Sequence, residues 1–249
     1  MSTFEFSDYL WPSPAEVIDL NESDVHVWLV NAGAKDIPQD LLSEDEQERA
    51  ARFRFAKDRR LHVAAHAALR SLLTAYLKVA ANEIRFVSGT HGKPALAQPL
   101  AASGLEFNLS HSHEVALVAV ARQSAVGVDV EFVKREFSFD ELARRFFTTK
   151  EVAALFELPQ PLQREAFFKC WTSKEAFLKA KGTGLSGKLD EVAITLVANQ
   201  QVRINASVPD WSLTELTLCA GYQGALVVQG DPRTIQCYQW ESSLIATRQ

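Results

Sequence analysis

Apolar residues in the first third of the chain follow two different spacings. Val25 to Val30 is a short run of β-branched and other apolar residues, which predicts a buried strand. From Ser43 to Tyr76 the apolar positions recur every three or four residues in a stretch rich in Ala, Leu, Arg and Glu, which predicts helix. Ser43 followed three residues later by Glu46 is typical of a capping box, and we expect a helix break near Lys57-Asp58.

Shorter apolar runs separated by turn-forming residues fill the rest of the chain. They predict strands at Ile84 to Val87, Leu105 to Leu109, Val115 to Ala121, Ala125 to Val133, Val192 to Val197, Val202 to Val208, Leu213 to Cys219 and Ala225 to Val228. Helical spacing recurs at Phe139 to Phe147, Lys150 to Phe156 and Arg164 to Lys181. A strand, helices and further strands are thus followed by roughly the same order again. This order predicts an α/β (α+β) fold in two halves, residues 1–124 and 125–249.

Composition narrows the class of protein. Of the 249 residues, 47% are hydrophobic and 23% are charged, as in ordinary globular proteins. A formal net charge of -5 argues against extended contact with nucleic acid, because phosphate backbones require clustered Lys and Arg. We find no signal-peptide pattern at the start and no apolar run of about 20 residues, so we expect a cytoplasmic protein with no membrane partner. Three widely separated cysteines argue against a disulfide framework.

Two carboxylates stand two residues apart in the predicted strand Gly127-Val128-Asp129-Val130-Glu131. The strand period of two places Asp129 and Glu131 on one face, about 7 Å apart along the backbone. Hard oxygen ligands at this spacing suit Mg²⁺, which binds one or two carboxylates together with substrate phosphates and water. A half-exposed strand with a solvated acidic face is the alternative.

A second charged pair lies on the predicted helix that stops at Gly182. Glu175 and Lys179 are four residues apart and therefore share a face of that helix. The carboxylate suits a metal ligand or general base, and the ammonium suits a phosphate clamp. An exposed ion pair, which contributes a few tenths of a kcal/mol, is the alternative.

Three further sites have the chemistry to bind an anion. Lys57, Arg59 and Arg60 form a basic cluster in the first helical region. Gly92-Lys93-Pro94 sets a lysine in a rigid turn, and Asn108-Leu109-Ser110-His111 ends a strand with hydroxyl and imidazole donors. Ordinary surface chemistry is the alternative for each of them.

Other motifs are incomplete. Gly182 to Lys188 has the GxxxxGK spacing of a P-loop, but Leu189 replaces the Ser or Thr that would hold Mg²⁺, and the segment follows a helix instead of a strand. His62 and His66 have the spacing of a helical zinc site, but Val63 stands where a metalloprotease needs Glu, which favours a pair of histidines on a helix surface.

The order of the motifs is more specific than any one of them. Taken in their order along the chain, the motifs resemble those of the surfactin-synthetase-type 4′-phosphopantetheinyl transferases across about residues 43 to 190. The segments that carry the resemblance are Phe53 through Arg70, Gly92-Lys93-Pro94, Phe107 through Ser112, Gly127 through Glu131, Phe146-Phe147 and Trp171 through Lys179. The elements GVDVE and WTSKEAFLK are the most specific. Glu46 and Arg49 depart from the pattern, because some family members have lysines in that stretch.

This resemblance implies two similar α/β halves that form a pseudo-twofold dimer within one chain, with coenzyme A and Mg²⁺ in the cleft between them. Asp129, Glu131 and Glu175 would ligate Mg²⁺, and Lys179 would contact the transferred phosphate. The remaining residues implied in coenzyme A binding, chiefly at its 3′-phosphate and adenine end, are Lys57, Arg60, Gly92, Lys93, Pro94, Asn108, Ser110 and His111.

The expected reaction moves 4′-phosphopantetheine from coenzyme A to a serine of an apo acyl, peptidyl or aryl carrier protein and releases adenosine 3′,5′-bisphosphate. Glu175 is the best-placed base for the serine proton, directly or through a metal-bound water. The carrier is usually acidic, so Arg144, Arg145, Phe146 and Phe147 are docking candidates, with core packing as the alternative for the phenylalanines. We expect a monomer, since a doubled chain has less need of a partner subunit.

Two rival functions remain open at the level of sequence. One is a non-catalytic module that binds coenzyme A or a nucleotide in the same fold. The other is a phosphotransferase that uses the 182–188 loop.

Overall fold

The computed structural model describes residues 11–14, 19–34, 36–89, 91–134, 136–184, 194–199, 201–206, 209–232 and 234–245. Within these ranges no helix is both long and apolar enough to cross a membrane. Most of the predicted P-loop-like segment, residues 185–188, lies outside the described residues. The same holds for the predicted strand ends at residues 192–193 and 207–208.

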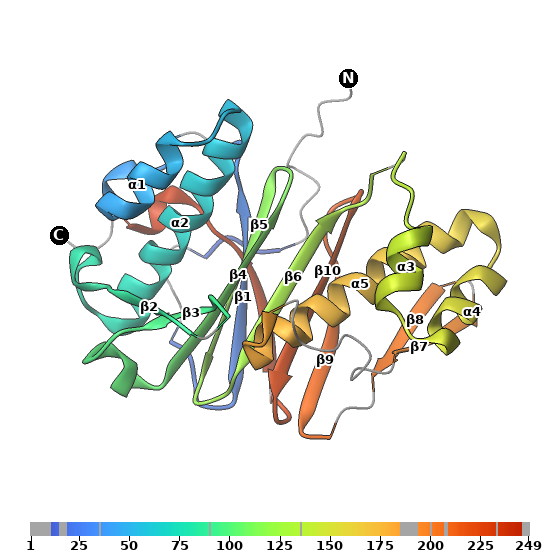
Figure 1. Ribbon diagram of the computed structural model, residues 1–249. Coiled ribbons are helices and arrows are strands. Elements are labelled where there is room, and N and C mark those ends of the chain that lie inside the picture. Colours follow the sequence, from blue (N-terminus) through green and yellow to red (C-terminus); the bar gives the residue numbers. More distant parts are fainter. Residues whose placement is uncertain are drawn as a thin grey trace.

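Two sheets form the centre of the molecule (Figure 1). The first has the strand order β11-β1-β5-β4, in which β11 is parallel to β1 and the other pairs are antiparallel. The second has the order β6-β10-β9 and is antiparallel. Their strands are β1 (Asp24–Asn31), β4 (Leu105–Ser112), β5 (Val115–Arg122), β6 (Val126–Phe132), β9 (Trp211–Leu216), β10 (Tyr222–Gln229) and β11 (Thr234–Gln239). Two hairpins lie outside these sheets, β2 (Phe86–Ser88) with β3 (Pro94–Leu96) and β7 (Ile194–Asn199) with β8 (Gln201–Ala206).

Helices cover the outer face of each sheet. In Figure 1, α1 and α2 lie on one side of the sheets and α3, α4 and α5 lie on the other side. Their bounds are α1 (Glu44–Ala51), α2 (Ala56–Leu77), α3 (Asp140–Phe146), α4 (Thr149–Glu157) and α5 (Gln160–Lys181). Short 3-10 helices occupy Gln39–Leu41, Ala81–Glu83, Leu100–Ser103 and Ser242–Ile245.

Three hydrophobic clusters hold these layers together. Leu72 of α2 belongs to the cluster between that helix and the first sheet. Phe177 of α5 belongs to the cluster between the helices of the second half and the second sheet. Between the sheets, Val27 and Leu117 of the first pack in one cluster with Val128 of the second. Strands β1 and β5 are therefore buried on both faces, which explains why their sequences are largely apolar instead of alternating, although β1 also buries His26.

The predicted fold class is confirmed, because the chain forms two halves that each combine a sheet with helices. The capping box of Ser43 and Glu46 is also confirmed. The helix break lies slightly earlier than predicted, between Ala51 and Ala56, because Phe55 adopts an extended conformation as the N-cap of α2.

Strand β11 was not predicted, and it connects the end of the chain to its beginning. Each residue from Thr234 to Gln239 pairs with a residue of β1, from Asp24 to Leu29. The first sheet is therefore built from both ends of the chain. The domain boundary at residue 124 stays a prediction.

Candidate active site

The two sheets meet along a seam between β4 and β6, which lie side by side in Figure 1. Alternate side chains of β4 accept hydrogen bonds from backbone N–H groups of β6. Asn108 Oδ1 accepts from Val128 at 2.9 Å, Ser110 Oγ from Val130 at 3.4 Å and Ser112 Oγ from Phe132 at 3.1 Å. We call Asn108, Ser110 and Ser112 with these N–H groups the seam. Polar side chains here replace the backbone carbonyls of a neighbouring strand, so they satisfy buried donors while joining the two halves.

The serines of the seam also bind the two carboxylates of β6. Ser110 Oγ donates a hydrogen bond to Asp129 Oδ1 at 2.8 Å, and Ser112 Oγ donates to Glu131 Oε2 at 2.8 Å. Lys179 of α5 donates to Ser110 Oγ at 2.7 Å and forms an ion pair with Asp129 Oδ1 at 2.6 Å. Residues of β4 and α5 thus converge on Asp129 of β6.

Helix α5 reaches this cluster because Gly127 lets it approach β6 closely. A Cβ atom at Gly127 would lie 2.0 Å from the carbonyl oxygen of Ala176 and 2.4 Å from the backbone nitrogen of Ala180. Only glycine leaves room for this contact. The four-residue spacing of Glu175 and Lys179 then puts both on the side of α5 that faces the carboxylates, as the sequence predicted.

Burial raises the pKa values of the three carboxylates, and Asp129 adds to the effect on the other two. Burial raises the pKa of Asp129, although Lys179 and Ser110 oppose this effect. Burial, followed by the charge of Asp129, raises the pKa of Glu131. Burial and the charges of Asp129 and Glu131 raise the pKa of Glu175 to about 7, against the opposing effect of Lys179. The site therefore holds more negative charge than Lys179 balances.

The residues suit a bound divalent cation. Asp129 Oδ2 is buried and has no hydrogen-bond partner among the described residues, so its lone pairs are free for a ligand. As they stand, no group of three His, Cys, Asp or Glu side chains in the described ranges is arranged to hold a metal, and Lys179 occupies Asp129 Oδ1. The available donors are carboxylate oxygens from Asp129, Glu131 and Glu175, which are the hard ligands that Mg²⁺ takes.

The residues predicted to bind coenzyme A occupy different environments. Lys57 and Arg60 are exposed on the first two turns of α2, and His111 is exposed near the end of β4. Asn108 and Ser110 are buried in the seam. These assignments to coenzyme A stay predictions.

The predicted Gly92-Lys93-Pro94 turn lies between β2 and β3. Gly92 has a φ of +83°, which favours glycine at this position, and Pro94 begins β3. The Lys93 ammonium donates to the carbonyls of Val126 at 3.0 Å and Ala180 at 3.2 Å. It is therefore engaged by the second half of the chain, which the sequence did not indicate.

The two helical histidines differ from the prediction of a surface pair, because His62 is buried. Their rings are 4.2 Å apart, and His66 Nδ1 lies 3.2 Å from Glu46 Oε1. Glu46 also forms a buried ion pair with Arg70 at 2.6 Å. The histidines thus belong to a structural network that joins α1 to α2.

Sequence reasoning did not assign a role to Ser112, which holds Glu131. The alternation of Asn108, Ser110 and Ser112 in an otherwise apolar strand is the signal that could have identified it, since period two places them on one face.

The candidate docking residues fall into two groups. Phe147 is 7% exposed and packs against Phe167 in the core, as the alternative of core packing predicted. Arg144 and Arg145 are exposed, and Arg145 lies over the ring of Phe146. Arg144 likewise lies over the ring of Phe156, so both arginines combine an exposed side chain with an aromatic contact.

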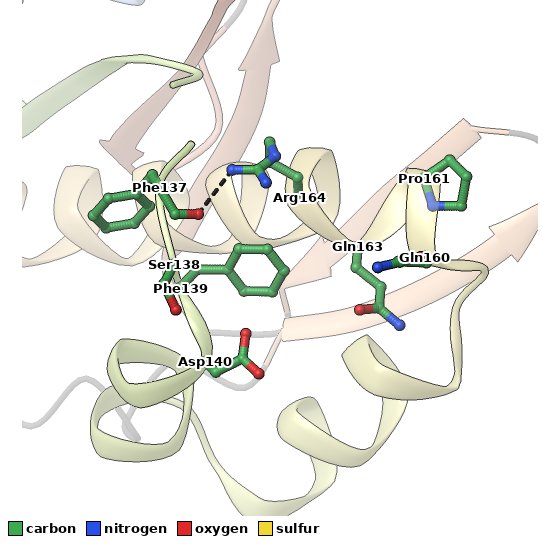
Figure 2. Close-up of a pocket in the computed structure, with 8 residues that line it drawn as sticks. All are labelled: Phe137, Ser138, Phe139, Asp140, Gln160, Pro161, Gln163 and Arg164. Carbon is green, nitrogen blue, oxygen red and sulfur yellow. Dashed lines mark hydrogen bonds between the residues drawn. The ribbon is translucent and has the colours of Figure 1, made fainter. Parts of the chain in front are cut away.

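A separate pocket of about 490 Å³ lies beside the first turns of α5 (Figure 2). Arg164 lines this pocket and donates hydrogen bonds to the carbonyls of Phe137 and Lys134, both at 2.8 Å. The pocket is lined by none of the carboxylates of β6 or their partners. It is therefore distinct from the candidate active site.

Comparison with known proteins identifies the family. Residues 34–123 match the model described as 4′-phosphopantetheinyl transferase, N-terminal, and residues 125–227 match the 4′-phosphopantetheinyl transferase superfamily. The chain is 38% identical over 223 residues to 4′-phosphopantetheinyl transferase HetI of Nostoc sp., which covers 88% of this chain and 93% of the relative.

Two further relatives are similar over shorter spans. Identity to 4′-phosphopantetheinyl transferase Sfp of Bacillus subtilis is 31% over 170 residues, covering 68% of this chain and 72% of Sfp. Identity to the human L-aminoadipate-semialdehyde dehydrogenase-phosphopantetheinyl transferase is 30% over 165 residues, covering 62% of this chain and 53% of that protein. The chain therefore belongs to the 4′-phosphopantetheinyl transferase superfamily and is an enzyme that activates carrier proteins.

Proposed function

We propose that this transferase takes 4′-phosphopantetheine from coenzyme A and attaches it to a serine hydroxyl of an apo carrier protein, with Mg²⁺ bound by Asp129, Glu131 and Glu175. Adenosine 3′,5′-bisphosphate is the leaving product. The observation that carries the metal assignment is the buried Oδ2 of Asp129, which has no hydrogen-bond partner in the described part of the chain and lies beside two further carboxylates and Lys179.

The charge of the site supports a cation there. Burial raises the pKa values of all three carboxylates, and the charge of Asp129 further raises those of Glu131 and Glu175. The site therefore gains stability from a divalent cation, which neutralises more charge than Lys179 alone. When bound, Mg²⁺ would neutralise the pyrophosphate of coenzyme A and stabilise the departing phosphate. The serines of the seam orient two of these carboxylates by hydrogen bonds, so Asp129 and Glu131 are held in place before substrate arrives.

Two residues of α5 carry the remaining roles. Lys179 has a side chain that is 28% exposed, so its ammonium is accessible from solvent while it is held near Asp129. It would contact a phosphoryl oxygen and offset the charge that develops there. Glu175 is half-buried on the same face and would accept the proton of the attacking serine hydroxyl.

Residues of the first half would bind the nucleotide end of coenzyme A. Lys57, Arg60 and His111 are exposed and have donors for phosphate oxygens. Asn108 and Ser110 would contribute by holding the seam, since their oxygens already accept N–H groups of β6. Gly92 and Pro94 would shape the turn beside them.

The reaction is tested by intact-mass spectrometry of a purified apo carrier protein after incubation with the enzyme, coenzyme A and Mg²⁺. We expect a gain of one phosphopantetheine group, and no gain when EDTA removes the metal. Glu175→Gln should abolish transfer without loss of the folded state. Asp129→Ala should raise the Mg²⁺ concentration that gives half-maximal activity or abolish activity.

Glu157→Gln is the matched control, because Glu157 is an exposed carboxylate on α4. Full activity of Glu175→Gln would remove that residue from the mechanism, and an unchanged metal titration of Asp129→Ala would refute its role as a ligand. Bound coenzyme A without transfer to fatty-acid, peptide or polyketide carriers would favour a non-catalytic binding module instead.

A further inference from the structure

Lys93 lies in the first half of the chain, at the end of a tight turn. Gly92 N donates to Gly89 O at 2.9 Å, and Gly89 N donates to Lys93 O at 2.9 Å. These bonds fix the backbone from which the Lys93 side chain extends. The side chain is therefore presented from a rigid base.

The ammonium of Lys93 binds two elements of the second half at once. Val126 is the first residue of β6, and Ala180 lies in the last turn of α5. Carbonyls in the last turn of a helix lack partners within the helix and carry partial negative charge, so a cation there is favourable. The two bonds of 3.0 and 3.2 Å thus join the end of α5 to the start of β6.

The stem of Lys93 also follows the end of α5. A Cβ atom at Gly182, the C-cap of α5, would lie 3.6 Å from Lys93 Cδ. Burial lowers the pKa of the Lys93 ammonium, although the charge of Glu106 opposes this. The two carbonyls take two of the three N–H donors of this half-buried ammonium, which disfavours its contact with a solvated phosphate.

Lys179 precedes Ala180 in the same turn of α5. The Lys179 ammonium lies 2.6 Å from Asp129 Oδ1, and this contact depends on the position of the last turn relative to β6. Gly127 lets that turn approach the strand, and Lys93 bonds its end to the residue before Gly127. Lys93 of the first half is therefore bonded to the same helical turn that carries Lys179 of the second half.

We propose that Lys93 is a positioning residue, which fixes the last turn of α5 on β6 and thereby sets Lys179 against Asp129, and that its side chain does not contact coenzyme A. This inference rests on the proposed role of Lys179. It assigns the lysine of the Gly92-Lys93-Pro94 turn to the geometry of transfer and not to binding of the donor.

The test is a double-mutant cycle of Lys93→Met and Lys179→Met, in which kcat and KM for coenzyme A are measured with saturating carrier protein and Mg²⁺. Lys93→Met should lower kcat about tenfold or more, because small displacements of catalytic groups are costly, while KM for coenzyme A stays within about twofold. The double variant should be no slower than Lys179→Met alone, because Lys93 acts through Lys179. Lys150→Met, at an exposed lysine of α4, is the control.

Each other outcome overturns the inference in a recognisable way. Losses of kcat that multiply in the double variant would show that Lys93 acts only on stability or by a separate route. A KM for coenzyme A raised about tenfold with kcat intact would show that Lys93 binds the donor. Full activity of Lys179→Met would remove the proposed role of Lys179 and the inference with it.

A second variant covers the case in which Lys93→Met does not fold. Lys93→Arg keeps the charge and the donors in a longer side chain, so it should fold with the last turn of α5 displaced. We expect a lower kcat and an unchanged KM for coenzyme A. An unchanged kcat in Lys93→Arg, or a raised KM alone, would refute the positioning role.

Discussion

Replacing Gly127 by alanine should separate helix α5 from β6 and impair transfer. The new Cβ atom would lie 2.0 Å from Ala176 O and 2.4 Å from Ala180 N, and both neighbours are backbone atoms that cannot rotate away. Since a Cβ contact below 3.0 Å is essentially never observed, the helix must withdraw by about 1 Å. That movement acts directly on the turns that carry Glu175 and Lys179.

Both stability and activity should change. Overpacking of this kind typically costs about 1–3 kcal/mol, which a urea-unfolding midpoint would detect. A misplacement of about 1 Å at catalytic groups can lower the rate about 100-fold, which single-turnover transfer followed by intact-mass spectrometry would detect. Activity should be measured at a temperature where circular dichroism shows the variant to be folded.

Gly224→Ala is the matched control. Gly224 lies opposite Val130 in the adjacent strand β10. Its added Cβ would meet the carbonyl oxygen of Asp129 at 3.3 Å, which a shift of a few tenths of an ångström relieves, and Leu218 Cδ1 at 2.8 Å. That atom is the end of a flexible side chain and can move aside. If folded Gly127→Ala transferred within about threefold of the rate of Gly224→Ala, the close approach of α5 would not control the site and the reasoning would be refuted.

Two buried ion pairs give further predictions. Burial alone would raise the pKa of Glu46, but hydrogen bonds from His66, Arg70 and Ser43 N outweigh this effect and lower it to about 2. The folded-state pKa is below the unfolded value of 4.5, so Glu46 contributes about 3 kcal/mol at neutral pH, and this is lost as the pH falls through about 2. In urea unfolding, the stability difference between wild type and Glu46→Gln should therefore shrink from pH 6 toward pH 2, and a difference independent of pH would contradict this account. Lys174→Met should cost about 3–5 kcal/mol, because it leaves the carboxylate of Glu151 buried without the ammonium that lies 3.0 Å away. Adding Glu151→Gln should recover part of that loss, whereas strictly additive losses would show that the pair is not coupled.

Local spacing allowed much of the site to be predicted from the sequence. The period of a strand puts Asp129 and Glu131 on one face, and a separation of four puts Glu175 and Lys179 on one face of a helix. The capping box at Ser43 follows from the same kind of local geometry. Each of these relations involves residues a few positions apart, so backbone geometry fixes them wherever the element lies.

The boundaries of β4 and β11 show where local patterns are insufficient. Ser110 and Ser112 continue β4 beyond the predicted end at Leu109, because they pair with β5 on one side and face β6 on the other. Strand β11 is recognisable only through its partner β1, which lies at the opposite end of the chain. Neither property is encoded by the residues of the strand alone.

The sequence by itself determined most of the helices and strands, the faces of their charged residues and the family to which the chain belongs. Only the tertiary structure decided that Ser110, Asp129 and Lys179 meet and that Lys93 of one half bonds the carbonyls of the other. The physical reason is that these contacts join residues between about 20 and 90 positions apart, so they exist only once the sheets pack face to face and α5 reaches β6 at Gly127. Dihedral preferences act over one turn of a helix or one strand, whereas buried hydrogen bonds and close packing select which elements become neighbours.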